Sequence, residues 1–404
     1  MEMFLLDNVI QHYDWGSHHA IAELQGRPAP SAKPEAELWM GAHPAAPSRL
    51  VSCDQTMLEA VEKSPAALLG VDVHARFGGF PFLLKILAAE QPLSIQAHPS
   101  KAQAEAGFAD EEARGISRSA PHRNYKDANH KPELLCALTR FEALCGFRPL
   151  DELLALFDLL ALPELGTARA AIEAHGAPEG VRQAFRALMQ REDNERAHLV
   201  AVTREACALH ASSGPFAPAL AWSLRLSKRY PGDLGAVSAL LLNHVVLEPG
   251  QAIYLDAGNL HAYLCGVGVE IMASSDNVLR GGLTSKHVDL PELLRVVDFA
   301  AGRVTPVSVE RRGNESVYRT PAPDFRLSRI DVSSAEAFSR EPSTFGHGPE
   351  ILLCTAGSTF LRSGDGKALT LARGSAALVG AGDARYTLEG EGAVFRASVG
   401  PASV

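Results

Sequence analysis

The feature that most constrains the fold is a change of hydrophobic periodicity near residue 150, which is reversed near residue 230. Between these points apolar residues recur at helical spacing, as in Leu153, Leu154, Phe157 and Leu160, because side chains three and four residues apart share one helix face. Before and after this block the apolar runs are short and separated by turn residues, a pattern typical of β-strands. The sequence therefore predicts a β domain interrupted by a helical insertion.

The flanking segments predict a mainly β fold. Residues 81–87 and 93–99 are two apolar runs joined by a tight turn, and short strands such as 376–379 alternate with glycine-rich turns near the C-terminus. Many short strands with frequent turns are typical of sandwiches and jelly rolls. We expect a discontinuous first β domain over residues 1–149 and 236–312, a helical insertion domain over 150–235, and a jelly-roll-like C-terminal domain over 313–404. The last contains one histidine, His347, and no ligand cluster, so we expect it to be structural.

Composition narrows the classes of function. The chain has 404 residues, and its formal net charge of -9 without a basic stripe argues against nucleic acid and acidic membranes as partners. No run approaches the roughly 20 apolar residues that span a bilayer, and the N-terminus lacks the pattern of a secretion signal. We therefore expect a cytoplasmic protein. Six scattered cysteines without a Cys-x-x-Cys pair argue against a disulfide framework and a thiolate zinc site.

Four residues have the chemistry of metal ligands. Gln96 and His98 lie two apart on a predicted strand, so both side chains leave the same face. Glu133 begins another apolar strand after Pro132, and His261 follows a strand end. Two imidazoles, a carboxylate and an amide oxygen suit zinc or a similar divalent ion. The alternative is that the histidines are hydrogen-bonded structural residues and that Glu133 caps or pairs locally, so the pattern alone indicates only a possible metal site.

Five separated segments resemble the type I phosphomannose isomerases. They are Tyr13-Asp14-Trp15-Gly16 and residues 36–44, 93–101, 125–133 and 266–286. Residues 268–280, which read Gly-Val-Glu-Ile-Met-Ala-Ser-Ser-Asp-Asn-Val-Leu-Arg, are the most specific. The resemblance extends over about residues 1–299, whereas the helical block and the C-terminal part match in placement more than in residues. Gln251 and the pair Asn259-Leu260 depart from the common pattern, and both flank the site.

The resemblance implies a cupin-type architecture of two jelly rolls with a helical insertion. It implies one Zn²⁺ held by Gln96, His98, Glu133 and His261, with Arg280 as a catalytic residue. The implied reaction is the metal-dependent aldose–ketose isomerisation of mannose 6-phosphate and fructose 6-phosphate, in which a proton moves between C1 and C2 through a cis-enediol. Supply of activated mannose, and so GDP-mannose biosynthesis, is the implied use of the product.

The remaining roles stay open at this stage. Glu270 and Asp276 are candidate bases, beside a free histidine or metal-bound water. For Arg280 the alternative to catalysis is a surface ion pair with Asp276. Residues expected to bind the sugar or its phosphate are Lys85, Ser94, Lys131, Lys286, Trp15 and Tyr263. Each lysine has a solvated or paired role as its alternative, and the aromatic residues have a core role.

Two rival functions follow from the same residues. A cupin-type dioxygenase usually binds iron through three histidines, or through two histidines and a carboxylate, and Gln96 and Arg280 argue against it. A non-catalytic sugar-phosphate sensor would keep the fold without turnover. We expect a monomer whose partner is a small phosphosugar.

Overall fold

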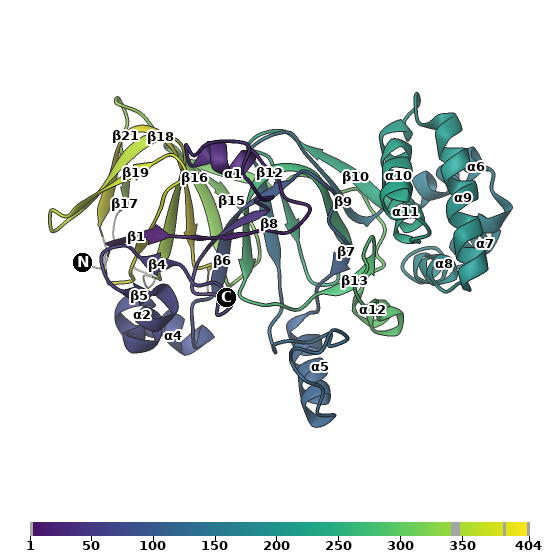
Figure 1. The fold of residues 1–404 in the computed structure, drawn as a ribbon, viewed down its shortest axis with the longest axis horizontal. Coiled ribbons are helices and arrows are strands. Elements are labelled where there is room, and N and C mark those ends of the chain that lie inside the picture. The colour runs from purple at the N-terminus through teal and green to yellow at the C-terminus, as the bar shows by residue number, and fades with distance from the viewer. Residues whose placement is uncertain (1–2, 341–347, 383–384, 402–404) are drawn as a thin grey trace.

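Two β-sheets and a helical block lie in a row along the molecule (Figure 1). The structure is a computed structural model and describes residues 3–340, 348–382 and 385–401. His347 lies outside the described residues. The first sheet occupies the middle, the second sheet one end and the helical block the other end, so the first sheet is covered on two sides (Figure 1).

The first sheet has ten strands and contains the residues singled out as metal ligands. Its main path is β10-β9-β12-β6-β3-β2, and β7, β8, β11 and β13 pair alongside in antiparallel register. The strands are β2 (Val9–Gln11), β3 (Glu37–Met40), β6 (Phe82–Ala89), β7 (Ile95–Ala97), β8 (Glu133–Ala137), β9 (Phe141–Phe147), β10 (Leu242–Leu247), β11 (Ala252–Leu255), β12 (His261–Ala273) and β13 (Leu279–Gly282).

The second sheet has eleven strands and includes the start of the chain. Met3 lies opposite Val379, so β1 pairs with β20, and β4 and β5 extend the same sheet. The strands are β1 (Met3–Asp7), β4 (Arg49–Leu50), β5 (Gln55–Thr56), β14 (Val309–Arg312), β15 (Glu315–Tyr318), β16 (Arg326–Val332), β17 (Phe338–Arg340), β18 (Glu350–Ser363), β19 (Ala368–Ala372), β20 (Ala376–Val379) and β21 (Tyr386–Ser398).

The helical block packs against the first sheet through one continuous apolar cluster. Ile95 and Leu144 from the sheet share this cluster with Leu153, Phe185 and Leu226 from the helices. The block contains α6 (Leu150–Leu160), η1 (Pro163–Leu165), α7 (Gly166–His175), α8 (Glu179–Met189), α9 (Asp193–His210), α10 (Ala217–Arg229), α11 (Gly235–Ser238) and η2 (Ala239–Leu241). The other helices are α1 (Ala20–Leu24), α2 (Met57–Lys63), α3 (Pro65–Leu68), α4 (Val71–Phe77), α5 (Lys101–Ala113) and α12 (Leu290–Val296).

Strand β8 is buried on both faces, and its alternate side chains pack into two different apolar clusters. Leu134 and Cys136 belong to the apolar cluster shared with the second sheet, whereas Leu135 and Ala137 belong to the cluster inside the first sheet. Since side chains alternate along a strand, Glu133 points to the same side as Leu135. A strand that is otherwise apolar therefore presents a carboxylate to the interior at its first residue.

The predicted fold class is confirmed: the protein is mainly β, with an all-helical block at the expected place. The expected domain limits stay predictions, and β1, β4 and β5 add the N-terminal segment to the second sheet. Among the described helices, none combines the length and apolar character needed to span a membrane.

The backbone conformation at Gly266 marks the point where β12 changes its pairing partner. The strand pairs with β9 up to Cys265 and with β6 from Gly266 onward. Gly266 has φ +124°, and a Cβ there would lie 2.8 Å from the carbonyl oxygen of Arg140 and 2.7 Å from the Phe141 ring. Only glycine adopts this conformation readily and leaves this space free.

Gly266→Ala should lower the free energy of unfolding by more than about 1 kcal/mol, because the alanine meets both an unfavourable φ and a backbone contact. Gly302→Ala is the matched control, since a Cβ at Gly302 has no heavy atom within 4 Å among the described residues. Denaturant unfolding of both variants measures the difference. Equal midpoints for the two variants would contradict the requirement for glycine at position 266.

Candidate active site

Strand register brings the expected ligands to one face of the first sheet. Gln96 on β7 lies directly opposite His261 on β12 and also opposite Arg280 on β13. Directly opposed residues of antiparallel strands point to the same face, so these three side chains share one side. His98 follows immediately after β7, and Glu133 begins β8.

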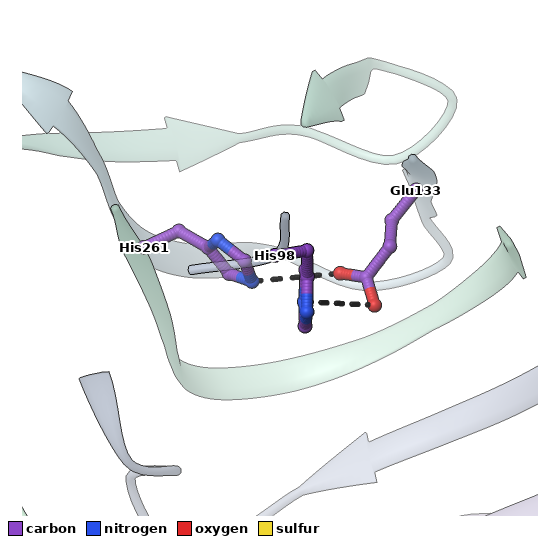
Figure 2. Close-up of side chains that lie close together, drawn as sticks. All are labelled: His98, Glu133 and His261. Atoms are coloured by element: carbon purple, nitrogen blue, oxygen red, sulfur yellow. Dashed lines mark ion pairs between the residues drawn. The ribbon is translucent and has the colours of Figure 1, made fainter. Parts of the chain in front are cut away.

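Two histidines and one carboxylate converge in the interior (Figure 2). The Nε2 atom of His98 lies 3.4 Å from Oε1 of Glu133, and Nε2 of His261 lies 3.4 Å from Oε2 of the same carboxylate. Their nearest ligand atoms all lie within 4.8 Å of one another. His98 and His261 are 1% exposed and Glu133 is 2% exposed, so water does not screen this cluster.

The other ring nitrogen of each histidine identifies the tautomer. Nδ1 of His98 lies 2.7 Å from the carbonyl oxygen of Asn277, and Nδ1 of His261 lies 3.0 Å from that of Asn259. A carbonyl oxygen only accepts hydrogen bonds, so Nδ1 holds the proton and the lone pair of each neutral ring is on Nε2. Metal-binding histidines in proteins are held by the same kind of bond.

The cluster fits a divalent cation. The two Nε2 lone pairs face oxygens of a carboxylate, so acceptors meet acceptors at 3.4 Å. Nε2 of both rings and Oε2 of Glu133 are buried without a hydrogen-bond partner among the described residues, and buried polar atoms normally have one. Burial lowers the pKa of His98 to about 4. Burial alone would raise the pKa of Glu133, but its neighbours, above all the ammonium group of Lys131, hold that pKa well below its usual value. Ligands of this type bind metals in these deprotonated forms.

Beside this cluster lies a cleft with a volume of about 510 Å³, which is within the usual range for small-molecule sites. Glu133 lines it, whereas His98 and His261 contact Glu133 but are not among the residues that line the cleft. The other residues expected from the sequence also line it, namely Trp15, Lys85, Ser94, Gln96, Lys131, Tyr263, Glu270, Asp276, Arg280 and Lys286.

Lys85 is buried between two carboxylates on the cleft wall. It lies opposite Glu270 in the register of β6 and β12, and its Nζ is 3.0 Å from Glu270 and 3.5 Å from Glu37. Burial alone would lower the pKa of Lys85, but the two carboxylates outweigh it and raise that pKa. Burial also raises the pKa of Glu270, against the opposing effect of Lys85.

The alternative role for Arg280 was a surface ion pair with Asp276, but Asp276 pairs with His43 instead. Its carboxylate lies 3.4 Å from Nε2 of His43, and its side chain is 47% exposed. The bond from His43 lowers the pKa of Asp276. No ion pair joins Asp276 to Arg280 within the described residues, so that alternative was wrong.

Four cations in the cleft have no hydrogen bond or ion pair from their side chains in the part of the chain that the structure describes. They are Lys126, Arg229, Arg280 and Lys286. The pKa of Lys286 is lowered by burial and then by the charges of Arg280 and Lys126. Like charges gathered without partners favour an anionic ligand.

The sequence interpretation missed several cleft residues. Glu37 and Trp39 share the face of β3 that lies next to Lys85, and Trp39 donates to Glu37 at 2.7 Å. Their spacing of two on a strand was a usable signal, because the segment 36–44 had already been singled out. Arg229, at the end of α10, has no such local signal.

The comparisons with known proteins agree with this site. A sequence profile of the type I phosphomannose isomerase catalytic domain matches residues 3–150. A mannose-6-phosphate isomerase of Salmonella typhimurium is 41% identical over 401 residues, with 97% of this chain and 98% of the relative covered. The human mannose-6-phosphate isomerase is 34% identical, with 82% of each chain covered.

The chain belongs to the type I phosphomannose isomerases. A crystal structure of mannose 6-phosphate isomerase from Salmonella typhimurium bound to fructose 6-phosphate and zinc has a TM-score of 0.90 and 38% identity, with 99% of this chain and 100% of that chain covered. A second crystal structure of mannose 6-phosphate isomerase, bound with zinc and yttrium, has a TM-score of 0.90 and 39% identity, again with 99% of this chain and 100% of that chain covered. The cupin-type architecture implied by the resemblance is confirmed by this likeness over the whole phosphomannose isomerase chain.

His98→Ala and His261→Ala should each abolish tight binding of one Zn²⁺ per phosphomannose isomerase chain, because each removes a buried ligand. His244→Ala is the matched control: His244 also pairs with a carboxylate, Glu142, at 2.8 Å, and it does not line the cleft. Metal analysis after dialysis measures the stoichiometry. One tight zinc retained by either ligand variant would contradict the assignment.

Proposed function

We propose that the chain is a mannose-6-phosphate isomerase that uses one Zn²⁺ held by Gln96, His98, Glu133 and His261. The observation that carries the proposal is the buried cluster in which two imidazole lone pairs face one carboxylate beside a cleft with unpaired cations. The relative whose crystal structure contains fructose 6-phosphate and zinc supports the same substrate and metal. When bound by these residues, zinc would supply Lewis-acid charge for the isomerisation.

Glu270 is the better of the two candidate bases. The isomerisation removes a proton from the carbon next to the carbonyl and returns it to the former carbonyl carbon, which needs a carboxylate of raised basicity. Burial raises the pKa of Glu270, whereas His43 lowers that of Asp276. Glu270 also stands on the cleft wall beside Lys85, whose ammonium group keeps the ionised form available.

Arg280 is suited to stabilise the negative oxygen of the enediolate. Its guanidinium is half-buried, free of internal partners among the described residues, and on the sheet face that also presents Gln96 and His261. A preorganised cation in a partly dry site stabilises developing charge more strongly than water does.

Lys131 forms an ion pair with Glu133, with Nζ 3.1 Å from Oε1.

The substrate phosphate is proposed to bind at the rim, where Lys126, Lys286 and Arg229 are exposed and unpaired within the described residues. Ser94, Lys85, Trp15 and Tyr263 would then contact the sugar deeper in the cleft. These three exposed cations would bind a phosphate dianion without the cost of burying any of them.

We also propose that the enzyme acts as a cytoplasmic monomer on this small phosphosugar. Exposed large apolar side chains come from different elements, for example Val71 on α4, Leu209 on α9 and Phe360 on β18. Scattered apolar residues of this kind do not form the patch typical of an obligate interface.

The purified protein should form fructose 6-phosphate from mannose 6-phosphate in a coupled assay, lose this activity on chelation and regain it with zinc. The coupling enzymes, treated with the same chelator and assayed with added fructose 6-phosphate, are the control. Full turnover by a verified metal-free sample would rule out zinc dependence, and no turnover by the zinc-loaded protein would rule out the function.

Glu270→Gln should lower kcat on the order of 100-fold or more, the size expected for a general base, while Asp276→Asn should lower it far less. Because the pKa of Glu270 is raised, the wild-type kcat should fall as the pH drops through that raised value, and Asp276→Asn should keep this limb of the profile. Zinc content is measured in both variants. If Asp276→Asn at full zinc content lost more kcat than Glu270→Gln, Asp276 and not Glu270 would be the base.

A further inference from the structure

The segment that leads into the carboxylate ligand is held from outside by the second β domain. Nε2 of His130, three residues before Glu133, lies 2.9 Å from Oδ2 of Asp324. Asp324 stands between β15 and β16 of the second sheet, 194 residues further along the chain. A hydrogen bond therefore joins the ligand-bearing segment to a different domain.

The burial of Asp324 makes this hydrogen bond costly to break. Its side chain is 3% exposed, that of His130 is 22% exposed, and no second hydrogen bond to the Asp324 carboxylate occurs within the described ranges. A buried carboxylate that loses its donor bears the full cost of desolvation. The imidazole of His130 is thereby held in one place.

The chain between His130 and Glu133 transmits this placement. Pro132 fixes its own φ and restricts Lys131 before it to extended conformations, and the carbonyl of Pro132 accepts from Ala273 N at 3.1 Å. Few torsions are left free over these residues. A displacement at His130 is therefore passed on to Lys131 and Glu133.

The same segment is fixed on its inner side by the group that orients His98. Asn277 donates to the carbonyl of Asn129 at 2.9 Å, and its own carbonyl accepts from His98. Along β8 itself, Tyr318 of the second domain lies 3.0 Å from the thiol of Cys136. The ligand segment is thus held between Asn277 inside and Asp324 outside.

We propose that Asp324 is a positioning residue, which acts through His130 to set the place of Glu133 and Lys131 in the metal site. The second β domain thereby has a role in metal binding as well as in covering the sheet. This inference rests on the proposed function in that Glu133 is taken to be a ligand of the ion.

The test compares Asp324→Ala, His130→Ala and the double variant in the full-length chain. Each is assayed for zinc affinity by competition with a chromophoric chelator, for kcat and KM at saturating zinc, and for unfolding midpoint without metal. Asp324→Ala should weaken zinc binding about tenfold, the low end for outer partners of ligands. His130→Ala should match it, and the double variant should be no weaker than either single one, because both remove one bond. Asp324→Asn keeps an acceptor oxygen and should recover most of the affinity.

Arg373→Ala is the control for a general loss of contact between domains, since Arg373 of the second domain donates to the carbonyl of Glu23 at 2.9 Å and has no hydrogen bond to β8 among the described residues. It should keep wild-type zinc affinity. Unchanged zinc affinity in Asp324→Ala, or losses that multiply in the double variant, would overturn the proposal. Should the alanine variants fail to fold, Asp324→Leu, which fills similar space without an acceptor, still has to weaken zinc binding, and wild-type affinity there would overturn the proposal. A wild-type chain that binds zinc but lacks isomerase activity would reject the proposed function alone.

Discussion

The placement of one buried carboxylate governs the rest of the site. Glu133 faces two imidazole lone pairs, and each of those rings is oriented by a backbone carbonyl behind it. Three acceptor groups directed at one another in a dry interior repel, because no solvent screens them. A divalent cation turns this repulsion into coordination. The neighbouring ammonium of Lys131 reduces the repulsion only in part, since it reaches one oxygen of Glu133.

The charges around this cluster favour an anionic intermediate only when the metal is present. The buried wall holds three carboxylates, Glu37, Glu133 and Glu270, against two ammonium groups, Lys85 and Lys131. With all five ionised, the wall has one excess negative charge, which opposes an enediolate. One divalent cation reverses that sign, and Arg280 adds a further positive charge at the edge of the wall. Metal binding and stabilisation of the intermediate are therefore consequences of one charge balance.

The sequence predicted what depends on local spacing and left out what depends on distant pairing. The recurrence of Leu153, Phe157 and Leu160 indicated the helical block, and the spacing of Gln96 and His98 indicated a shared face. The pairing of β1 with β20, by contrast, joins residues hundreds of positions apart, and no periodicity encodes it. Asp276 and Arg280 were weighed as partners because they are close in sequence. In the fold Asp276 lies before β13 and meets His43, which no local pattern indicates.

In the proposed arrangement, the cations that bind the substrate phosphate lie apart from the charged groups that act on the reacting carbons. Lys126, Lys286 and Arg229 are exposed at the rim, where the proposed phosphate position would contribute equally to binding of the substrate and of the transition state. Such uniform binding affects KM more than kcat. The buried wall of Lys85, Glu270 and Glu133 is held rigidly by strand register and contacts only the reacting end of the sugar in the proposed arrangement. An unphosphorylated sugar would meet the same wall without the rim contacts and would bind more weakly, so the loss would be in KM more than in kcat.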